Sequence, residues 1–276
     1  MPFTRRALLA LALALGVMAP ALARAGPAVT LYAAGSLTDA LTEAAKAYTA
    51  ATGAEVATRF GPSGEMRGRI EAGEPATVFA SADYGNPRRL ADEGRAGPAV
   101  VFARNRLCAM TRPGLAVTPD YLLAIMLNPA VKLGVATPGN EPSGDYARTL
   151  FAKAERVTPG AKAALEAKAL KLTGGKDSAP VPAGRNAYAW HIAERRADLF
   201  LGYCSAGEAA AAELPGLQVV ELPKELAVDA DDGLVVLRGP AEQEAAAARF
   251  AMFVLSPEGQ AILARWGFAP ATAPAS

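Results

Sequence analysis

Two serines, Ser36 and Ser63, occupy positions from which a protein can bind an anion. Each follows a short apolar run that is typical of a strand, and each precedes a segment with the apolar spacing of a helix. We interpret each serine as the N-cap of its helix, and Ser36 has Asp39 three residues later, as in a capping box. The first N–H groups of a helix lack intrahelical acceptors, and the helix dipole adds partial positive charge there. The sequence therefore predicts two anion-binding helix starts, although capping alone would also explain both serines.

Strands and helices alternate in the first part of the chain, which predicts a mainly parallel sheet. Apolar runs at 29–33, 55–60 and 77–80 are separated by helical segments that begin at Ser36 and Ser63. Connections between such strands are right-handed, and ligands bind beyond the carboxyl ends of the strands. We therefore expect Ser36 and Ser63 at the same rim of the sheet.

The rest of the chain predicts a second lobe and a return to the first. An apolar run at 100–110 leaves the first lobe, and a run at 233–237 leads back to it. Two strands that cross between lobes form a hinge and a cleft. Further helices are expected at 118–127, after 143, at 161–172, 187–196, 241–254 and 256–266, further strands at 131–136 and 199–203, and a solvated turn at the acidic run 229–232.

Several stretches resemble the periplasmic molybdate-binding proteins of ABC importers, which belong to the type II periplasmic binding proteins. The resemblance rests on 31–39 (LYAAGSLTD), 60–73 (FGPSGEMRGRIEAG), 79–83 (FASAD), 142–147 (PSGDYA), 202–203 (GY) and 255–268 (LSPEGQAILARWGF). It implies an α/β protein of two lobes, each a mainly parallel sheet flanked by helices, joined by two crossover hinge strands. We expect a signal peptide at 1–25, lobe 1 at 26–105 and 237–276, and lobe 2 at 106–236.

The resemblance also implies which residues contact the oxyanion. Ser36 and Ser63 match two serines of the first lobe, which donate through their hydroxyl and backbone N–H groups. Ser143 falls where the family offers a backbone N–H at another helix start, and Tyr203 matches a tyrosine whose hydroxyl closes the cage. Arg185 replaces an apolar residue that supplies the remaining N–H. Its side chain therefore either points to solvent or adds a positive charge to the pocket.

A cage that contains only N–H and O–H donors suits a fully ionised tetrahedral anion such as molybdate, tungstate or sulfate. A protonated phosphate oxygen would find no acceptor there, at a cost of about 1–3 kcal/mol. We therefore expect a binding protein, not an enzyme, that captures molybdate or tungstate and delivers it to a membrane ABC permease. Arg185 and the departure from the family at 84–89 (YGNPRR) favour the alternative of another oxyanion or a small organic acid.

The N-terminus has the pattern of a secretory signal peptide. Arg5 and Arg6 precede an uncharged apolar run at 7–18, and small residues lead to Ala25. The apolar run is too short to span a bilayer, so we expect a periplasmic protein. The formal net charge of the chain is +1, which gives no electrostatic basis for nucleic-acid binding, and we expect a monomer.

The chain has 2 cysteines, Cys108 and Cys204, and 1 histidine, His191. In an oxidising periplasm the cysteines can form a disulfide, and two separate buried thiols are the alternative. A periplasmic serine hydrolase, an alternative of another class, would use Ser63 or Ser143 with His191 as its base. A single histidine without an acidic or thiol cluster argues against a transition-metal site, and we expect no cofactor.

Overall fold

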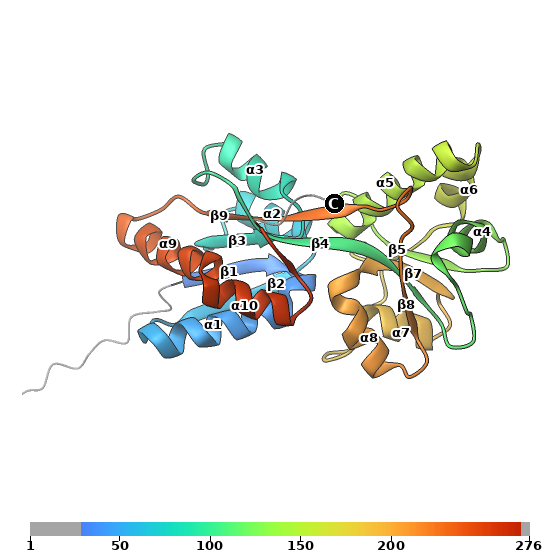
Figure 1. Cartoon of the computed structure of the whole chain (residues 1–276). Coiled ribbons are helices and arrows are strands. Elements are labelled where there is room, and N and C mark those ends of the chain that lie inside the picture. The colour runs from blue at the N-terminus through green and yellow to red at the C-terminus, as the bar shows by residue number, and fades with distance from the viewer. Residues whose placement is uncertain (1–28, 272–276) are drawn as a thin grey trace, which may run out of the picture.

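The computed structural model describes residues 29–271. Figure 1 shows two lobes, each a sheet with flanking helices, joined by two long strands, β4 (Val100–Thr111) and β9 (Asp229–Val236). This is the two-lobed α/β architecture expected from the resemblance. The predicted signal peptide, residues 1–25, lies outside the described residues. Within 29–271, no helix is both long and apolar enough to cross a membrane.

Lobe 1 is built on three parallel strands. Its elements are β1 (Val29–Ala34), β2 (Val56–Gly61), β3 (Val78–Ser81), β10 (Ala269–Pro270), the 3-10 turn η1 (Gly35–Leu37), and the helices α1 (Thr38–Thr52), α2 (Ser63–Glu71), α3 (Gly85–Asp92), α9 (Ala241–Leu255) and α10 (Pro257–Arg265). β1 lies between β2 and β3, and Leu31 is level with Thr58 on β2 and Val78 on β3. Because these strands are parallel, η1 and α2 begin at the same edge of the sheet.

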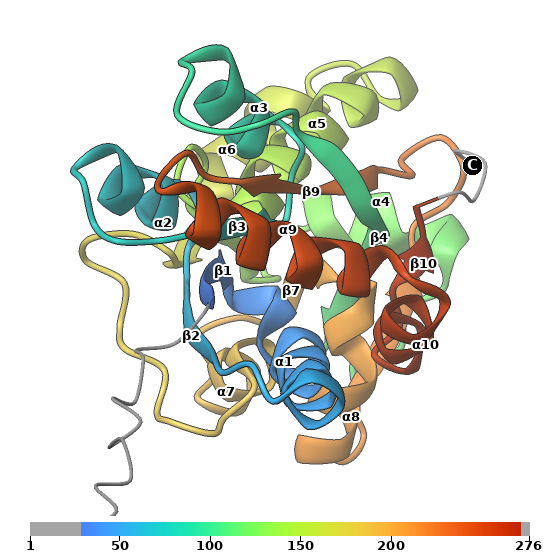
Figure 2. The ribbon, with the colours of Figure 1, turned by 90° about the vertical axis from the view of Figure 1, so that its left-hand side faces the viewer.

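Helices cover both faces of the lobe 1 sheet (Figure 2). Leu31 and Ala33 belong to a core cluster that includes residues of α1, α9 and α10. Tyr32 and Phe79 point to the other face, into a cluster with residues of α2 and α3. Successive side chains of a strand point to opposite faces, so a continuous apolar run is needed when both faces are buried.

Lobe 2 repeats this arrangement. Its elements are β5 (Leu133–Ala136), β6 (Leu170–Thr173), β7 (Leu199–Tyr203), β8 (Gln218–Glu221), the turns η2 (Pro119–Tyr121) and η3 (Cys204–Ala206), and the helices α4 (Leu122–Leu127), α5 (Pro142–Val157), α6 (Ala161–Lys168), α7 (Ala187–Ala193) and α8 (Gly207–Glu213). β5 pairs in parallel with β6 and β7. One core cluster joins this sheet to α4, α5 and α6, and another joins it to α7 and α8.

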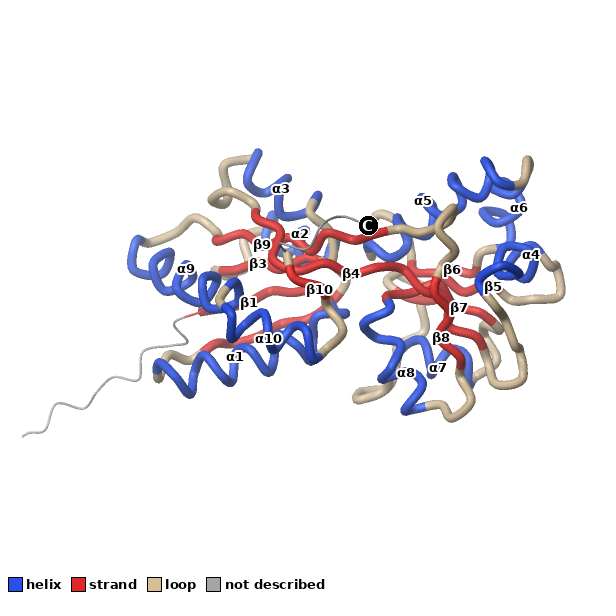
Figure 3. The backbone as a smooth tube through the Cα atoms, viewed as in Figure 1, coloured by secondary structure: helices blue, strands red, loops and turns tan. Residues whose placement is uncertain are grey.

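The strands β4 and β9 connect the lobes (Figure 3). The first half of β4 pairs antiparallel with β9, and its second half pairs with β7 and β8. β9 continues into lobe 1, where it pairs antiparallel with β3. β4 therefore pairs with strands of both lobes, and β9 lies beside its first half. The division of the chain at 105/106 and 236/237 stays a prediction.

Three segments differ from the expectation. The predicted helix at 187–196 ends at Ala193. The predicted helix at 161–172 ends at Lys168, because Ala169 is extended and residues 170–173 pair with β5 as the strand β6. The acidic run at 229–232 is the first half of β9 and not a solvated turn. Pairing with β4 places Asp232 in the interior, where it is 0% exposed.

Cys108 and Cys204 form a disulfide. Cys108 lies on β4, and Cys204 directly follows β7. These strands are antiparallel neighbours, with Leu107 level with Tyr203, so the two cysteines lie close together. Of the two alternatives left open by the sequence, the structure has the bridge.

Candidate functional site

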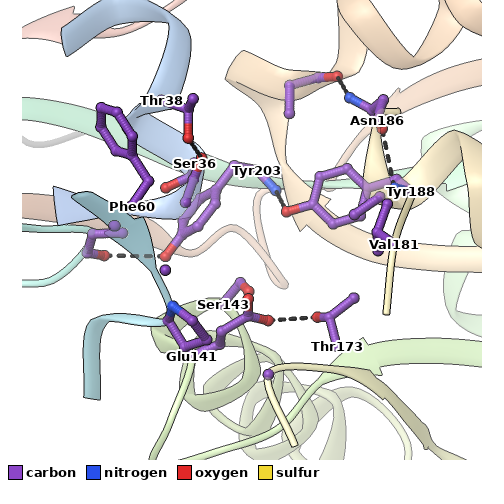
Figure 4. A pocket seen from close by; sticks show the side chains of 18 of the residues that line it. Ser36, Thr38, Phe60, Glu141, Ser143, Thr173, Val181, Asn186, Tyr188 and Tyr203 are labelled. Atoms are coloured by element: carbon purple, nitrogen blue, oxygen red, sulfur yellow. Dashed lines mark hydrogen bonds between the residues drawn. The ribbon is translucent and has the colours of Figure 1, made fainter. Parts of the chain in front are cut away.

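A cavity of about 1250 Å³ lies between the lobes (Figure 4). Lobe 1 contributes the ends of β1 and β2 and the starts of η1 and α2, and lobe 2 contributes the start of α5, the loop 174–185 and the end of β7. All the residues implied as oxyanion contacts line this cavity: Ser36, Ser63, Ser143, Arg185 and Tyr203. The fold thus brings together residues that are distant in the sequence.

Ser36 lies in the turn η1, which comes between β1 and α1. The N-cap residues of η1 and α1 are Ala34 and Leu37, and neither forms a side-chain hydrogen bond to its helix. The capping-box prediction for Ser36 and Asp39 is therefore wrong. The physical reason is the additional 3-10 turn, in which the Thr38 hydroxyl donates to the Gly35 carbonyl at 2.7 Å. The Ser36 hydroxyl therefore does not cap α1.

Ser63 is the first residue of α2, and Pro62 takes the N-cap position. The capping prediction is therefore wrong here too. Ser63 is 1% exposed, and its hydroxyl oxygen accepts the Ala82 N–H at 3.3 Å. The Ser63 N–H belongs to the first turn, for which a helix offers no acceptor. The next N–H, of Gly64, donates across the lobes to the Asn140 carbonyl at 2.8 Å.

Ser143 provides a third helix start, from lobe 2. It is the second residue of α5, after Pro142, which suits a first helical position because it lacks an N–H group. Ser143 is 4% exposed. The lobes therefore present three buried or half-buried serines at three helix starts to one cavity.

Tyr203 closes the inner end of the cavity. Its hydroxyl donates to the Ala82 carbonyl at 3.0 Å, which links β7 of lobe 2 to the end of β3 in lobe 1. Burial raises the pKa of Tyr203 well above its usual value, and the nearby Asp232 carboxylate raises it further. The hydroxyl therefore remains protonated and acts as a donor.

Arg185 lines the cavity, and its side chain forms an ion pair with Glu213. Its guanidinium Nε lies 2.6 Å from Glu213 Oε1, and its backbone N–H donates to the Pro182 carbonyl at 3.1 Å. The other carboxylate oxygen of Glu213 accepts the Asn186 N–H at 2.6 Å, and Asn186 caps α7. The guanidinium of Arg185 is thus paired with a carboxylate through Nε, and its role as an oxyanion contact stays a prediction.

Two residues of the site were missed from the sequence, Glu141 and Tyr188. Tyr188 packs against Gly202, where an added Cβ would lie 2.4 Å from the ring, and its hydroxyl oxygen accepts the Tyr203 N–H at 3.4 Å. Glu141 precedes α5, and the Thr173 hydroxyl donates to its carboxylate. Burial raises the pKa of Glu141. Glu141 directly precedes Pro142-Ser143, and this adjacency was the one available indication.

The residues needed for a serine hydrolase do not come together. His191 lies on α7, is 0% exposed and stacks on Phe200, and it is not among the residues that line the cavity. Burial lowers the pKa of His191 to about 4, so its ring is neutral near pH 7. In the described part of the chain, no group of three or more His, Cys, Asp or Glu side chains could hold a metal ion.

The sequence matches a protein-family model over residues 29–269, nearly the whole described range. That family is the bacterial extracellular solute-binding proteins. The chain belongs to this family. A cavity between two lobes that are joined by crossover strands is the arrangement expected of such a solute-binding protein.

Relatives within the curated proteins agree with this assignment. An uncharacterized Pasteurella multocida protein, PM1146, is 38% identical over 63% of this chain and 73% of its own length. The molybdate-binding protein ModA of Rhodobacter capsulatus is 32% identical over 52% of this chain and 56% of its own length. The solute-binding protein described here thus spans little more than half the length of that ModA relative.

Solved structures share the fold over most of both chains. The Azotobacter vinelandii periplasmic molybdate-binding protein has a TM-score of 0.70 at 22% identity and covers 90% of this chain and 100% of its own. The Mycobacterium tuberculosis sulfate-binding protein SubI has a TM-score of 0.69 at 18% identity, over 88% and 86%. PEB3 bound to L-phospholactate has a TM-score of 0.66 at 18% identity, over 87% and 99%. The resemblance and the type II fold predicted from the sequence are confirmed.

Proposed function

We propose that this protein is the periplasmic binding component of an ABC importer, captures an oxyanion between its lobes and delivers it to a membrane permease. The observation that carries the proposal is the convergence of three serine-bearing helix starts on one cavity, two from lobe 1 and one from lobe 2. Molybdate and tungstate are the first candidates, since ModA proteins are among the relatives.

The chemistry of the three helix starts suits an anion. Ser36, Ser63 and Ser143 lie in first turns, where backbone N–H groups lack helical acceptors and the helix dipole is positive. The cavity offers these neutral donors, and the guanidinium of Arg185, which also lines the cavity, is paired with Glu213. Since the donors come from both lobes, an anion that binds all of them favours the closed arrangement by its differential affinity.

The first test measures binding of molybdate, tungstate, sulfate and phosphate to the purified protein by titration calorimetry. Ser36→Ala removes a hydroxyl that has no role in capping α1. We expect it to weaken binding of the preferred oxyanion about 10- to 100-fold, because a hydrogen bond to a charged group contributes about 1.5–3 kcal/mol. Thr118→Ala, at an exposed site outside the cavity, is the control.

Affinity and melting temperature together distinguish a loss of anion binding from a loss of folding. A loss of affinity in Ser36→Ala with an unchanged melting temperature, and no loss in Thr118→Ala, supports the proposed cage. If no oxyanion binds to the parent protein, or if Ser36→Ala binds as the parent does, the proposal is wrong.

A further inference from the structure

The cavity contains a carboxylate that a cage of donors alone does not explain. Glu141 lines the cavity beside Ser143 (Figure 4), and one of its carboxylate oxygens, Oε2, accepts the Thr173 hydroxyl. Gly174 lies against the same side chain, and a Cβ added there would be 2.7 Å from the Glu141 Cγ atom. The contacts with Thr173 and Gly174 therefore hold the Glu141 carboxylate in one position.

The second oxygen of this carboxylate is open to a ligand. Among residues 29–271, Oε1 of Glu141 has no hydrogen-bond partner, whereas Oε2 accepts the Thr173 hydroxyl. The Thr173 hydroxyl has one proton and donates it to Oε2, so the carboxylate keeps its accepting role. A carboxylate repels a bare dianion, whereas it binds a group that carries a donor.

The size of the cavity also favours a solute larger than a bare oxyanion. A water molecule takes about 30 Å³ of liquid, so an anion with four oxygens needs roughly 100–150 Å³. The cavity of about 1250 Å³ is several times larger and exceeds the usual range of small-molecule sites. The loop 174–185 forms part of the lining of this cavity and includes the apolar residues Ala179, Pro180 and Val181. An organic group attached to the oxyanion would fit this cavity.

We propose that the solute is a small organic molecule with a tetrahedral oxyanion group and a hydroxyl group, and that Glu141 accepts a hydrogen bond from that hydroxyl. This inference rests on the proposed function, since the serine helix starts hold the oxyanion group. A phosphate monoester of a polyol has this chemistry. Glu141 then determines which solute binds. Its carboxylate strengthens the binding of a solute that donates a hydrogen bond to it, and it repels an anion that has no donor.

The test compares two ligands that differ in their hydroxyl groups, glycerol 3-phosphate and propyl phosphate, with molybdate as the bare oxyanion. Titration calorimetry is done at pH 7.5 on the parent protein, Glu141→Gln and the control Glu225→Gln, which changes an exposed glutamate outside the cavity. We expect the parent to bind glycerol 3-phosphate at least 10-fold more tightly than propyl phosphate. In Glu141→Gln this preference should fall about 10-fold, because a neutral acceptor forms a weaker bond than a carboxylate. The control should keep the preference.

Each result has a distinct meaning. A preference for the hydroxyl that depends on Glu141 supports the inference. Equal binding of the two phosphate esters, or a preference that Glu141→Gln leaves intact, overturns it. If the parent binds molybdate more tightly than either ester, and Ser36→Ala weakens that binding, this inference fails while the proposed function stands. If neither ester binds, and none of molybdate, tungstate, sulfate and phosphate binds, the proposed function itself fails.

Discussion

Tyr203 has one hydroxyl proton, and that proton joins the two lobes. The hydroxyl donates to the Ala82 carbonyl at 3.0 Å, and both residues are almost fully buried. The Tyr203 ring also packs against Tyr146 of α5, with ring centroids 6.3 Å apart. Because the proton cannot be donated twice at once, an oxyanion that uses the Tyr203 hydroxyl must take it from Ala82. We infer that this hydrogen bond of Tyr203 helps to hold the lobes together.

Tyr203→Phe is expected to destabilise the protein without solute. The change leaves the Ala82 carbonyl buried and without this donor, which costs about 1–3 kcal/mol. Urea unfolding followed by circular dichroism measures the free energy of unfolding. Tyr121→Phe is the matched control, since Tyr121 is 69% exposed. Equal stability of the two variants would contradict the role of Tyr203 in joining the lobes.

The sequence predicted the residues at strand ends better than the residues that surround them. Ser36 and Ser63 were placed at one rim because parallel strands bring their carboxyl ends together, and both line the cavity. Their capping role was wrong, because a 3-10 turn and a proline occupy the positions before the helices. Glu141 and Tyr188 were missed, because their place in the cavity depends on tertiary contacts with Thr173 and Gly202.

Among the secondary-structure elements, the crossover strand β9 has an unusual composition for a buried strand. Asp232 is 0% exposed, and neither of its carboxylate oxygens has a hydrogen-bond partner among the described residues. Burial raises the pKa of Asp232 well above its usual value, and the charges of Asp83 and Asp231 raise it further. Tyr146 and Tyr203 of lobe 2 lie close enough for this charge to raise their own pKa values. The hinge therefore contains a carboxyl group that is more stable with its proton.

Asp232→Asn is expected to raise stability above neutral pH. A carboxyl whose pKa is raised by folding contributes stability below its unfolded pKa, about 3.9, and loses it as the pH rises through the folded value. Asparagine resembles the protonated form at every pH. The melting temperature of Asp232→Asn should therefore exceed that of the parent at pH 8, by about 2–4 °C for each 1 kcal/mol, and approach it at pH 4.

Asp120→Asn, at an exposed site, is the control for the same pH series. A difference between Asp232→Asn and the parent that does not change with pH would show that Asp232 does not take up a proton on folding.

The same strand explains why parts of the fold were not predictable. Apolar runs such as 29–33 and 199–203 correctly indicated β1 and β7, because both faces of these strands are buried. The run at 229–232 has three acidic residues, which favours a solvated turn, yet pairing with β4 makes it a strand. Pairing with β5 likewise overrides the helical pattern of residues 170–172. In each case a neighbour distant in the sequence decides the conformation.

At the scale of the whole molecule, the lobes meet at a contact that only glycine permits. The Gly64 N–H on α2 donates to the Asn140 carbonyl of lobe 2 at 2.8 Å. A Cβ added to Gly64 would lie 2.7 Å from the Gly139 carbonyl oxygen and 3.0 Å from the Asn140 Cα atom. Real Cβ atoms do not approach backbone atoms so closely, so an alanine there requires the lobes to move apart. Within lobe 1 alone, the same alanine would favour the helix.

Gly64→Ala and Gly68→Ala therefore separate closure from local stability. Both glycines lie in α2, and a Cβ at Gly68 would meet nothing within 4 Å. Alanine in a helix interior is favoured over glycine by about 1 kcal/mol, so Gly68→Ala should be at least as stable as the parent and bind the preferred oxyanion equally well. Gly64→Ala should bind it at least 10-fold more weakly and have a larger radius of gyration in small-angle X-ray scattering, because closure is obstructed. Equal affinity and equal radius in the two variants would mean that solute capture does not depend on this contact between the lobes.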